Sequence, residues 1–338
     1  MAQPVAKLSK FDKLLRNNSE DVTEPVRKHL QEFRSYFKNS VTTDVFLLDK
    51  IIQYLLRQKG KEIRPTLVFM TARMFGDVTE RSYVAATMIE LLHTATLIHD
   101  DVVDEANRRR GLLSINKLWR NKAGVLLGDF LLSKGLLIAL DHQEYKLLHV
   151  LSTAVKKMSE GELRQLKTSR LFNMTEERYY QIISEKTASL IAACCQCGAI
   201  SATDNEQIHN DILDIGMKIG IAFQIKDDLF DYGLEDVGKP RRNDIKERKV
   251  TLPLIKALDN SSALEQFRIR RLMKKRKKTG KNIEEIVQFV HEKNGMSEAH
   301  SSMEQHANEA LDKLNKLPVN EHLSDFQFLV EYIINRKK

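Results

Sequence analysis

One acidic pattern occurs twice in this chain, at residues 100–104 (DDVVD) and 227–231 (DDLFD). Both copies lie in apolar, helix-forming stretches, where burying a charge is costly. In a helix the first and last Asp of each copy share one face, because they are four residues apart. Two carboxylates about 4 Å apart repel by about 4 kcal/mol at an effective dielectric constant of about 20. A solvated acidic turn explains one copy well but two copies poorly, so the pattern predicts bound divalent metal ions.

Cationic and polar residues accompany both acidic patterns. His93 lies seven residues before Asp100, on nearly the same helical face, and Arg64 stands at a helix entrance, where free N–H groups favour anions. Arg suits phosphate through its planar fork and Lys as a point charge. A surface ion network accounts for each cation separately but poorly for the whole set, which predicts a diphosphate ligand. The set comprises Lys61, Arg64, His93, Arg108, Arg109 and Arg110 around the first pattern, and Lys186, Thr187, Gln224, Lys239 and Lys249 around the second.

The composition favours helices throughout the chain. It has 338 residues, 42% of them hydrophobic, and no proline stands between Pro65 and Pro240. Alternating β-branched runs between turn dipeptides are missing, so we expect an all-α protein. Gly216 and Gly220 are spaced for close helix packing, although chance gives this spacing as often. We expect one domain over 1–338, with 1–20 as a polar arm and long helices over 81–105, 119–140, 152–168, 175–199 and 210–232.

The positive charge is concentrated in one segment. The net charge is +8, and residues 268–281 (RIRRLMKKRKKTGK) hold nine cations and no acidic residue, so the rest of the chain sums to 8 − 9 = −1. A solvated basic helix end is the favoured interpretation. Attraction to an anionic membrane or to nucleic acid is the alternative, but aromatic residues that would stack on bases are not interleaved with the cations.

Cysteine use and the termini predict a cytoplasmic protein. Cys194, Cys195 and Cys197 lie together in an apolar stretch, and this odd count fits neither a disulfide framework nor a four-ligand zinc site. We expect small core residues in a reducing compartment. The N-terminus lacks a secretory apolar segment, and Asp12 argues against an organellar presequence. We also expect no stretch of about 18 apolar residues that would span a membrane.

These motifs together resemble those of the trans-isoprenyl diphosphate synthases, the polyprenyl synthetase family, of the long-chain type. The matching segments are GKxxRP at 60–65, HTATLIHDDVVD followed by RRG at 93–111, GD at 128–129, KT at 186–187, FQxxDDxxD at 223–231 and GK…RKxTLP at 238–253. They follow the family's order from about residue 30 to 335. Where the family often has GGKRxRP, this chain has Lys59 for the first Gly and Glu62 for the Arg. Lys226 replaces a commonly apolar residue.

The resemblance implies a fold, a reaction and roles for individual residues. It implies a single all-α bundle around a central cavity, usually a homodimer, that condenses isopentenyl diphosphate head to tail onto an allylic diphosphate. Mg²⁺ ions, about three per site, would be bound by Asp100, Asp104 and Asp227. Asp101, Asp228 and Asp231 would support them. Residues implied for the allylic diphosphate are Arg109, Lys186, Lys239 and Lys249, with Thr187 and Gln224 beside them; those for isopentenyl diphosphate are Lys61, Arg64, His93 and Arg110.

The helix of the first acidic pattern also lines the product cavity in this family. Short-chain members place bulky aromatics around the positions of Ala95 and Thr96 in this chain. Leu91, Met88 and Val84 follow from Ala95 back along the same face. One helical turn of about 5.4 Å is comparable to one isoprene unit, so an open tunnel to Met88 would admit about seven to ten units, or about C35–C50. Alternatively, Ala95 serves a helix–helix contact.

Other functions remain open at this stage. The chain could make a short product of C15–C20, or be a non-catalytic partner subunit of a heteromeric synthase, although such a subunit would be expected to lose acidic or Arg positions. A terpene cyclase would usually carry an Asn/Ser/Glu metal triad in place of a second DDxxD. We expect no nucleic-acid partner, and peripheral contact with a membrane through the hydrophobic product.

Overall fold

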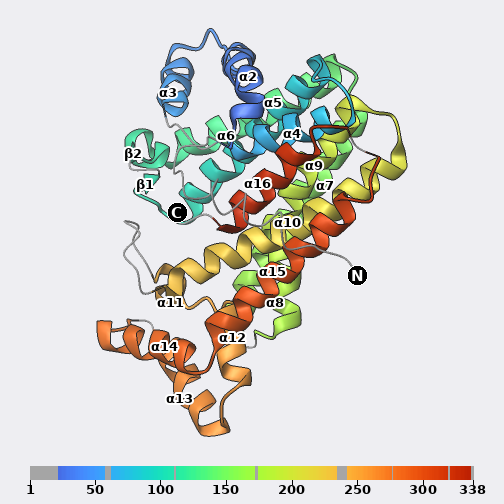
Figure 1. The fold of residues 1–338 in the computed structure, drawn as a ribbon. Coiled ribbons are helices and arrows are strands. Elements are labelled where there is room, and N and C mark those ends of the chain that lie inside the picture. The colour runs from blue at the N-terminus through green and yellow to red at the C-terminus, as the bar shows by residue number, and fades with distance from the viewer. Residues whose placement is uncertain are drawn as a thin grey trace, which may run out of the picture.

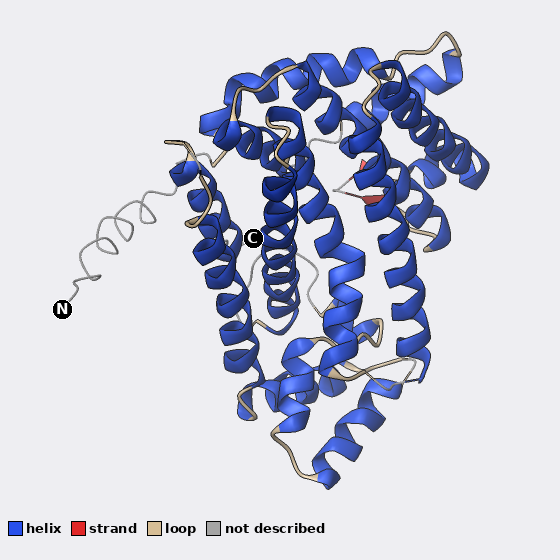
Figure 2. Ribbon diagram, turned by 90° about the vertical axis from the view of Figure 1, so that its right-hand side faces the viewer, coloured by secondary structure: helices blue, strands red, loops and turns tan. Residues whose placement is uncertain are grey.

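The computed structural model describes residues 22–57, 62–109, 112–171, 174–233, 242–275, 277–318 and 320–335. The predicted N-terminal arm, 1–20, lies outside these residues. The described part is almost wholly helical (Figures 1 and 2), which confirms the all-α prediction. The exception is a two-residue antiparallel pair, β1 (Arg108–Arg109) and β2 (Leu112–Leu113), in the arginine-rich connection after the first acidic pattern. These strands were not predicted from the sequence.

The N-terminal half supplies the helices around the first acidic pattern. They are η1 (Glu24–Val26), α2 (Arg27–Ser40), α3 (Phe46–Leu56), α4 (Ile63–Phe75), α5 (Glu80–Val103), α6 (Ile115–Asp141) and α7 (Tyr145–Leu171). Thr79 and Ser82 form a capping box that starts α5. The expected helices over 81–105, 119–140 and 152–168 thus exist, the last two being longer than predicted.

The C-terminal half supplies the second acidic pattern and a smaller helical group. Its elements are α8 (Glu176–Ile183), η2 (Ser184–Ala188), α9 (Ser189–Ala202), α10 (Glu206–Tyr232), α11 (Asn243–Lys246), α12 (Leu252–Asp259), α13 (Ala263–Lys274), α14 (Gly280–Glu292), α15 (Gly295–Leu314) and α16 (Leu323–Asn335). The helix predicted over 175–199 is interrupted by η2, a short π-helical turn. The Thr175 hydroxyl accepts from the backbone N–H of Arg178 and starts α8.

Helix α9 is central in the main core and packs against α4, α5, α7 and α10. It is buried from Ser189 to Ser201, including the three cysteines, which are free thiols. Burial raises the pKa of all three thiols, to about 12 for Cys195, so they act as small core residues as predicted. Gly216 allows α10 to approach α9 closely, because a Cβ there would lie 2.7 Å from Cα of Ala192.

One face of α6 is buried and the opposite face is exposed and apolar. Gly124 and Gly128 bring α6 against α5, where a side chain would collide with Val102 or His99. By length and composition α6 is apolar enough to cross a membrane, which the sequence analysis did not expect of any segment. Of the most apolar 18-residue window of α6, 33% is buried inside the protein. Its exposed apolar side chains are Leu118, Val125, Leu126, Leu132, Leu136, Leu137 and Leu140.

Candidate active site at the ends of two helices

Both acidic patterns occupy the C-terminal end of a helix. Helix α5 ends at Val103 with Asp104 as its C-cap, and α10 ends at Tyr232. The last turns of α5 and α10 contain no basic residue. A helix C-terminus carries about half a negative charge, so carboxylates there raise the local negative potential. This arrangement costs stability unless cations bind, as expected of a site for positive ions.

The second Asp of each pattern is buried and bonded to protein groups. Asp101, 4% exposed, accepts hydrogen bonds of 2.8 Å from Nε and the guanidinium NH2 of Arg109. Asp228, 3% exposed, accepts from the Tyr179 hydroxyl at 2.7 Å and from the Gln224 amide at 2.8 Å. These bonds fix both carboxylates as structural anchors, and their support of metal binding stays a prediction.

The carboxylates predicted to bind metal lie at the protein surface, beside the buried Asp101 and Asp228. Asp100, Asp104 and Asp227 are exposed, whereas their neighbours Asp101 and Asp228 point into the protein. Carboxylate oxygens are the donors that Mg²⁺ prefers. Within the described residues, no group of three or more His, Cys, Asp or Glu side chains converges as a closed metal site. Ions bound here would therefore need oxygens from another molecule, such as a diphosphate.

Three carboxyl groups of the site, those of Asp100, Asp228 and Asp244, have raised pKa values. Although Asp100 is exposed at the surface, partial desolvation of its carboxyl group by the surrounding side chains, followed by the charges of Glu162 and Asp104, raises its pKa. Burial, with the charge of Asp244 next, raises the pKa of Asp228 to about 8. Asp244 is itself raised to about 6, by burial and then by the charge of Asp231. Raised carboxyl pKa values mean that local cations do not balance the negative charge, so bound metal ions fit this donor set.

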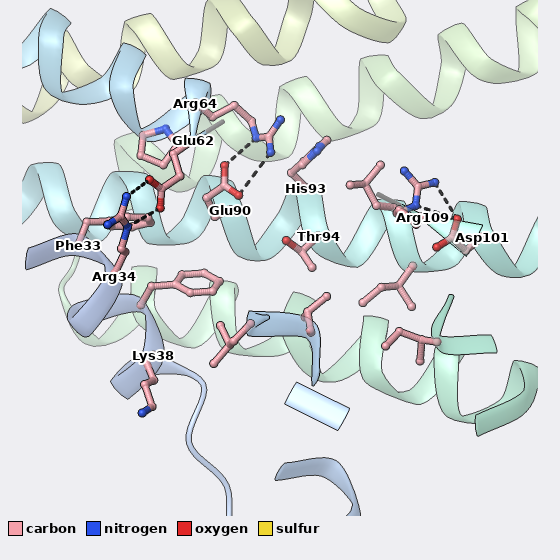
Figure 3. A pocket seen from close by; sticks show the side chains of 17 residues that line it. Phe33, Arg34, Lys38, Glu62, Arg64, Glu90, His93, Thr94, Asp101 and Arg109 are labelled. Atoms are coloured by element: carbon pink, nitrogen blue, oxygen red, sulfur yellow. Dashed lines mark hydrogen bonds and ion pairs between the residues drawn. The ribbon is translucent and has the colours of Figure 1, made fainter. Parts of the chain in front are cut away.

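A pocket of about 470 Å³ borders the first acidic pattern. Its wall contains Arg64, His93 and Arg109, which lie in a row along α5 (Figure 3). Arg64 donates from Nε to Glu90 at 2.7 Å, and Arg109 is held by Asp101. The fold thus brings together three cationic or basic side chains named from the sequence. Arg109 was assigned to the allylic diphosphate, yet it lies in the same pocket as the two assigned to isopentenyl diphosphate.

The wall of this pocket also contains Glu62, one of the departures from the family pattern. Glu62, which stands where the family often has Arg, accepts hydrogen bonds from Arg34 of α2 at 2.6 and 3.0 Å (Figure 3). A cation is therefore restored at this position by a residue from another helix. Lys61 and Arg110, also predicted to bind isopentenyl diphosphate, lie outside the described residues.

The charge of Lys186 acts on a carboxyl group of the first acidic pattern and on one near the second. Its positive charge partly offsets the rise in the pKa of Asp100 on α5 and of Asp244, which follows α10 in the chain. Lys186 forms an ion pair with Glu162 of α7 and donates to the amide oxygen of Gln165 at 3.3 Å. It belongs to the π-helical turn η2, and such turns are frequent at functional sites. The position suits a cation that contacts a ligand shared by both patterns.

A hydrogen-bonded chain connects η2 with the second acidic pattern. The Thr187 hydroxyl donates to Gln224 at 2.8 Å, and Gln224 in turn donates to Asp228. Lys249 pairs with Glu247 at 2.7 Å and lies 3.8 Å from Asp244. Thr187, Gln224 and Lys249 line a small pocket of about 90 Å³ together with Lys186, Asp228 and Asp244. Lys239, predicted to act beside Lys249, lies outside the described residues.

Several residues of the site were not found from the sequence. Asp244 could have been found, because it lies inside the segment 238–253 that matches the family. The others stand in ordinary helical sequence and gain their roles through contacts between distant elements. They are Glu90, Glu162, Gln165 and Tyr179.

The residues predicted to gauge product length lie in closely packed surroundings. Ala95 and Leu91 are buried among side chains of α3 and α6, and Met88 is buried in the main core. None of the pockets described above is lined by these three residues; α5 contributes Thr94, Leu97 and Ile98 to the larger one. Thr96 is partly exposed and donates to the carbonyl of His93 at 2.8 Å. The roles of these residues in chain length remain predictions.

Comparison with known proteins identifies the family. A family model described as polyprenyl synthetase matches residues 45–290. The chain belongs to the polyprenyl synthetase family. Heptaprenyl diphosphate synthase component 2 of Bacillus subtilis (strain 168) is 33% identical over 304 residues, covering 89% of this chain and 86% of that protein. Geranylgeranyl diphosphate synthase of Saccharolobus solfataricus is 27% identical, covering 95% of this chain and 100% of that one.

Solved structures agree with this assignment. The crystal structure of a decaprenyl diphosphate synthase from Rhodobacter capsulatus superimposes with a TM-score of 0.87 at 29% identity, covering 94% of this chain and 98% of that one. The polyprenyl synthetase described here is thus a prenyltransferase with the isoprenoid synthase fold, as the sequence predicted. Relatives named for products from geranylgeranyl to decaprenyl resemble it, so the family alone leaves the product length open.

Proposed function

We propose that this polyprenyl synthetase condenses isopentenyl diphosphate head to tail onto an allylic diphosphate and makes a long all-trans polyprenyl diphosphate of about C35–C50. One observation supports the reaction above all. Arg64, His93 and Arg109 converge in a single pocket whose end is Asp101 of the first acidic pattern. A diphosphate bound there places its prenyl end beside the exposed carboxylates at the helix termini.

The exposed carboxylates Asp100, Asp104 and Asp227 are the residues that would bind Mg²⁺. When bound, Mg²⁺ neutralises the diphosphate leaving group of the allylic substrate and so favours loss of diphosphate. Asp101 and Asp228 keep the neighbouring backbone in place through their bonds to Arg109 and Tyr179. The second acidic pattern is a full DDxxD, which argues against a cyclase.

The protein's own cations orient both substrates and stabilise the departing charge. Arg64 and His93 hold the diphosphate of isopentenyl diphosphate, so that its double bond faces the allylic carbon. Lys186 and Lys249, which line the smaller pocket, hold the allylic diphosphate as it leaves. The proton that isopentenyl diphosphate loses after the new carbon–carbon bond forms is accepted by the released diphosphate. Protein nucleophiles are not required, since the reaction forms no covalent enzyme intermediate.

The long product is supported by the small side chain at Ala95. A bulky aromatic there would limit extension toward Leu91 and Met88, and this chain has none at Ala95 or Thr96. Each added isoprene unit moves CH₂ groups out of water, and burial of each group is favourable by about 0.8 kcal/mol, which favours extension into an apolar interior. A short product of C15–C20 is the alternative, because the side chains along this face are closely packed in the structure.

We further propose a homodimer formed through α6. The exposed face of this helix presents Leu126, Leu136, Leu137 and other apolar side chains that are not covered by any described residue. Contiguous apolar surfaces of this kind mark interfaces. An obligatory heteromeric partner is not expected, since the described site retains each acidic residue and the cations Arg64, Arg109, Lys186 and Lys249.

One experiment tests the reaction and the product length together. The purified protein alone is incubated with labelled isopentenyl diphosphate, a C15 allylic diphosphate and Mg²⁺, and the dephosphorylated products are chromatographed. We expect polyprenols of about C35–C50, and no product after addition of EDTA. Products of C20 or shorter would contradict the long-chain proposal, and activity only with a second protein would support a heteromeric enzyme. Size-exclusion chromatography with light scattering measures the dimer.

A further inference from the structure

Helix α13 presents an outward face that the rest of the protein leaves uncovered. Its inner face, with Ile269, Leu272 and Met273, packs into the core formed by α12, α13 and α14. On the outer face Leu264 is 83% exposed and Phe267 is 69% exposed. Figure 1 shows α13 and α14 together at one end of the molecule, away from α6. Single exposed apolar residues are ordinary, but two large ones on one helical turn are less so.

The same outer face continues as a row of cations. Arg268, Arg271 and Lys275 follow Leu264 and Phe267 at intervals of three and four residues, so all five side chains lie on one side of α13. Arg268 is paired with Glu285 of α14. Arg270, Arg271 and Lys277 are exposed and form no ion pair with any described residue. The face is therefore apolar at the start of α13 and cationic toward its end.

The inner face of α13 lies beside the segment that follows Lys249. Burial, and after it the charge of Arg248, lowers the pKa of Lys278 to about 8, so the connection between α13 and α14 lies near the residue that precedes Lys249. Val250 and Leu254 also pack against Ile269 and Met273 of α13. The inner face of α13 thus neighbours the segment that contributes Lys249 and Val250 to the small pocket, and the outer face points away from it.

We propose that the outer face of α13 binds an anionic lipid membrane. Arg and Lys near such a surface each contribute about 1 kcal/mol of binding, and exposed Leu and Phe insert at the boundary between headgroups and acyl chains. Leu264 and Phe267 supply the apolar part and Arg271, Lys275 and Lys277 the charged part. The proposal does not require the enzyme to hold a product, because these side chains are outside the active site.

Nucleic acid fits this surface less well than a membrane. Binding to single strands uses several aromatic side chains on which successive bases stack, whereas Phe267 is the only aromatic residue of α13. Leu264 would gain nothing from a phosphate backbone but gains from an acyl chain. The two parts of the surface together match a lipid bilayer with anionic headgroups.

Vesicle flotation of the ligand-free protein tests the proposal. We expect binding to vesicles of phosphatidylcholine with phosphatidylglycerol, and weak binding to phosphatidylcholine alone or at high salt, because salt screens the cations. Arg271→Glu/Lys275→Glu/Lys277→Glu should weaken partitioning at least about a hundredfold. Leu264→Gln/Phe267→Gln should also weaken partitioning onto the vesicles, although this variant keeps all the cations. A charge-matched control, Lys28→Glu/Lys157→Glu/Lys316→Glu, changes exposed lysines elsewhere and should bind as wild type.

Activity and folding controls make the outcome decisive. All three variants should retain the helical circular dichroism signal and wild-type turnover with soluble substrates, since none of the changed residues lies in the active site. Equal binding to neutral and anionic vesicles, or equal weakening by the control variant, would overturn the proposal. Binding of RNA that the α13 substitutions abolish, without binding to vesicles, would assign the surface to nucleic acid instead. Synthase activity is measured separately, so failure of the proposed function leaves this test intact.

Discussion

The Tyr179 hydroxyl donates a 2.7 Å hydrogen bond to the buried carboxylate of Asp228. Tyr179 belongs to α8 and Asp228 to α10, so this bond fixes the end of α10 from outside the helix. Arg109 bonds to Asp101 in the same way at the end of α5. In both acidic patterns the second Asp is thus an anchor, and the Asp before it is exposed.

Removal of the Tyr179 hydroxyl should disturb the second acidic pattern. Tyr179→Phe leaves one oxygen of Asp228 without its donor in a buried position, which costs about 1–3 kcal/mol. We expect a lower melting temperature and a lower kcat, with a higher Mg²⁺ requirement. Tyr180→Phe, on the adjacent and less buried residue, is the matched control. Equal effects of the two substitutions on the Mg²⁺ requirement would show that the Asp228 bond has no specific role.

The two neighbours Asp100 and Asp101 should differ in what their substitution changes. Asp100→Asn removes an exposed carboxylate and should raise the Mg²⁺ concentration needed for half-maximal activity, with kcat reduced by about a hundredfold or more. Asp101→Asn instead weakens the anchor of Arg109 and should chiefly raise KM for a diphosphate substrate and lower stability. Mg²⁺ titrations and substrate kinetics on both variants distinguish these effects. Identical profiles would contradict the division into anchor and ligand.

The geometry of Arg64 should matter more than its charge. Arg64→Lys retains a cation but cannot reproduce the fork that contacts Glu90 and a diphosphate together. We expect KM for isopentenyl diphosphate to rise about tenfold, equivalent to about 1.4 kcal/mol of lost binding, with a smaller change for the allylic substrate. Arg34→Lys, at the outer end of the pocket, is the control and should have a smaller effect. The opposite order would place the binding site near Glu62.

Ala95→Tyr should shorten the product. The new ring must enter the apolar cluster that Ala95 shares with Leu127 and Leu131, and overpacking there costs about 1–3 kcal/mol. Thermal unfolding is therefore measured beside chromatography of the products, so that loss of folding is not mistaken for loss of extension. Thr96→Tyr, one residue along α5, tests the neighbouring face. An unchanged product length from a folded Ala95→Tyr enzyme would show that Ala95 is only a helix contact.

The contribution of His306 and His29 to stability should fall as the pH drops below neutrality, whereas the raised pKa values of Asp228 and Asp244 act in the opposite direction. Burial lowers the pKa of both below the ordinary value of 6.5. As the pH falls through 6.5 the unfolded chain takes up protons before the folded one, so stability present above 6.5 is lost toward the lower folded pKa. Relative to wild type, His306→Gln should therefore lose less, or gain more, free energy of unfolding between pH 7.5 and 5.5, measured in urea. His300→Gln, at an exposed position, should not.

Much of the fold could be predicted because helix signals are local. The capping Thr175, the apolar period of α5 and α10 and the missing prolines each act within a few residues. The interruption of α8–α9 by η2 could not be predicted, since a π-helical turn adds one residue without a distinct composition. Likewise, the packing of Gly128 against His99 explains the GD segment only once α6 lies beside α5.

The sequence by itself determined the chemistry of this protein: two DDxxD patterns on apolar helices, the accompanying cations and hence a prenyl diphosphate synthase. Only the tertiary structure decided how these residues divide their roles. It buries Asp101 and Asp228 against Arg109 and Tyr179 and leaves Asp100 and Asp227 exposed. The physical reason is that residue type and spacing report on a single helix, whereas burial and hydrogen bonding of a carboxylate depend on side chains that other helices bring to it.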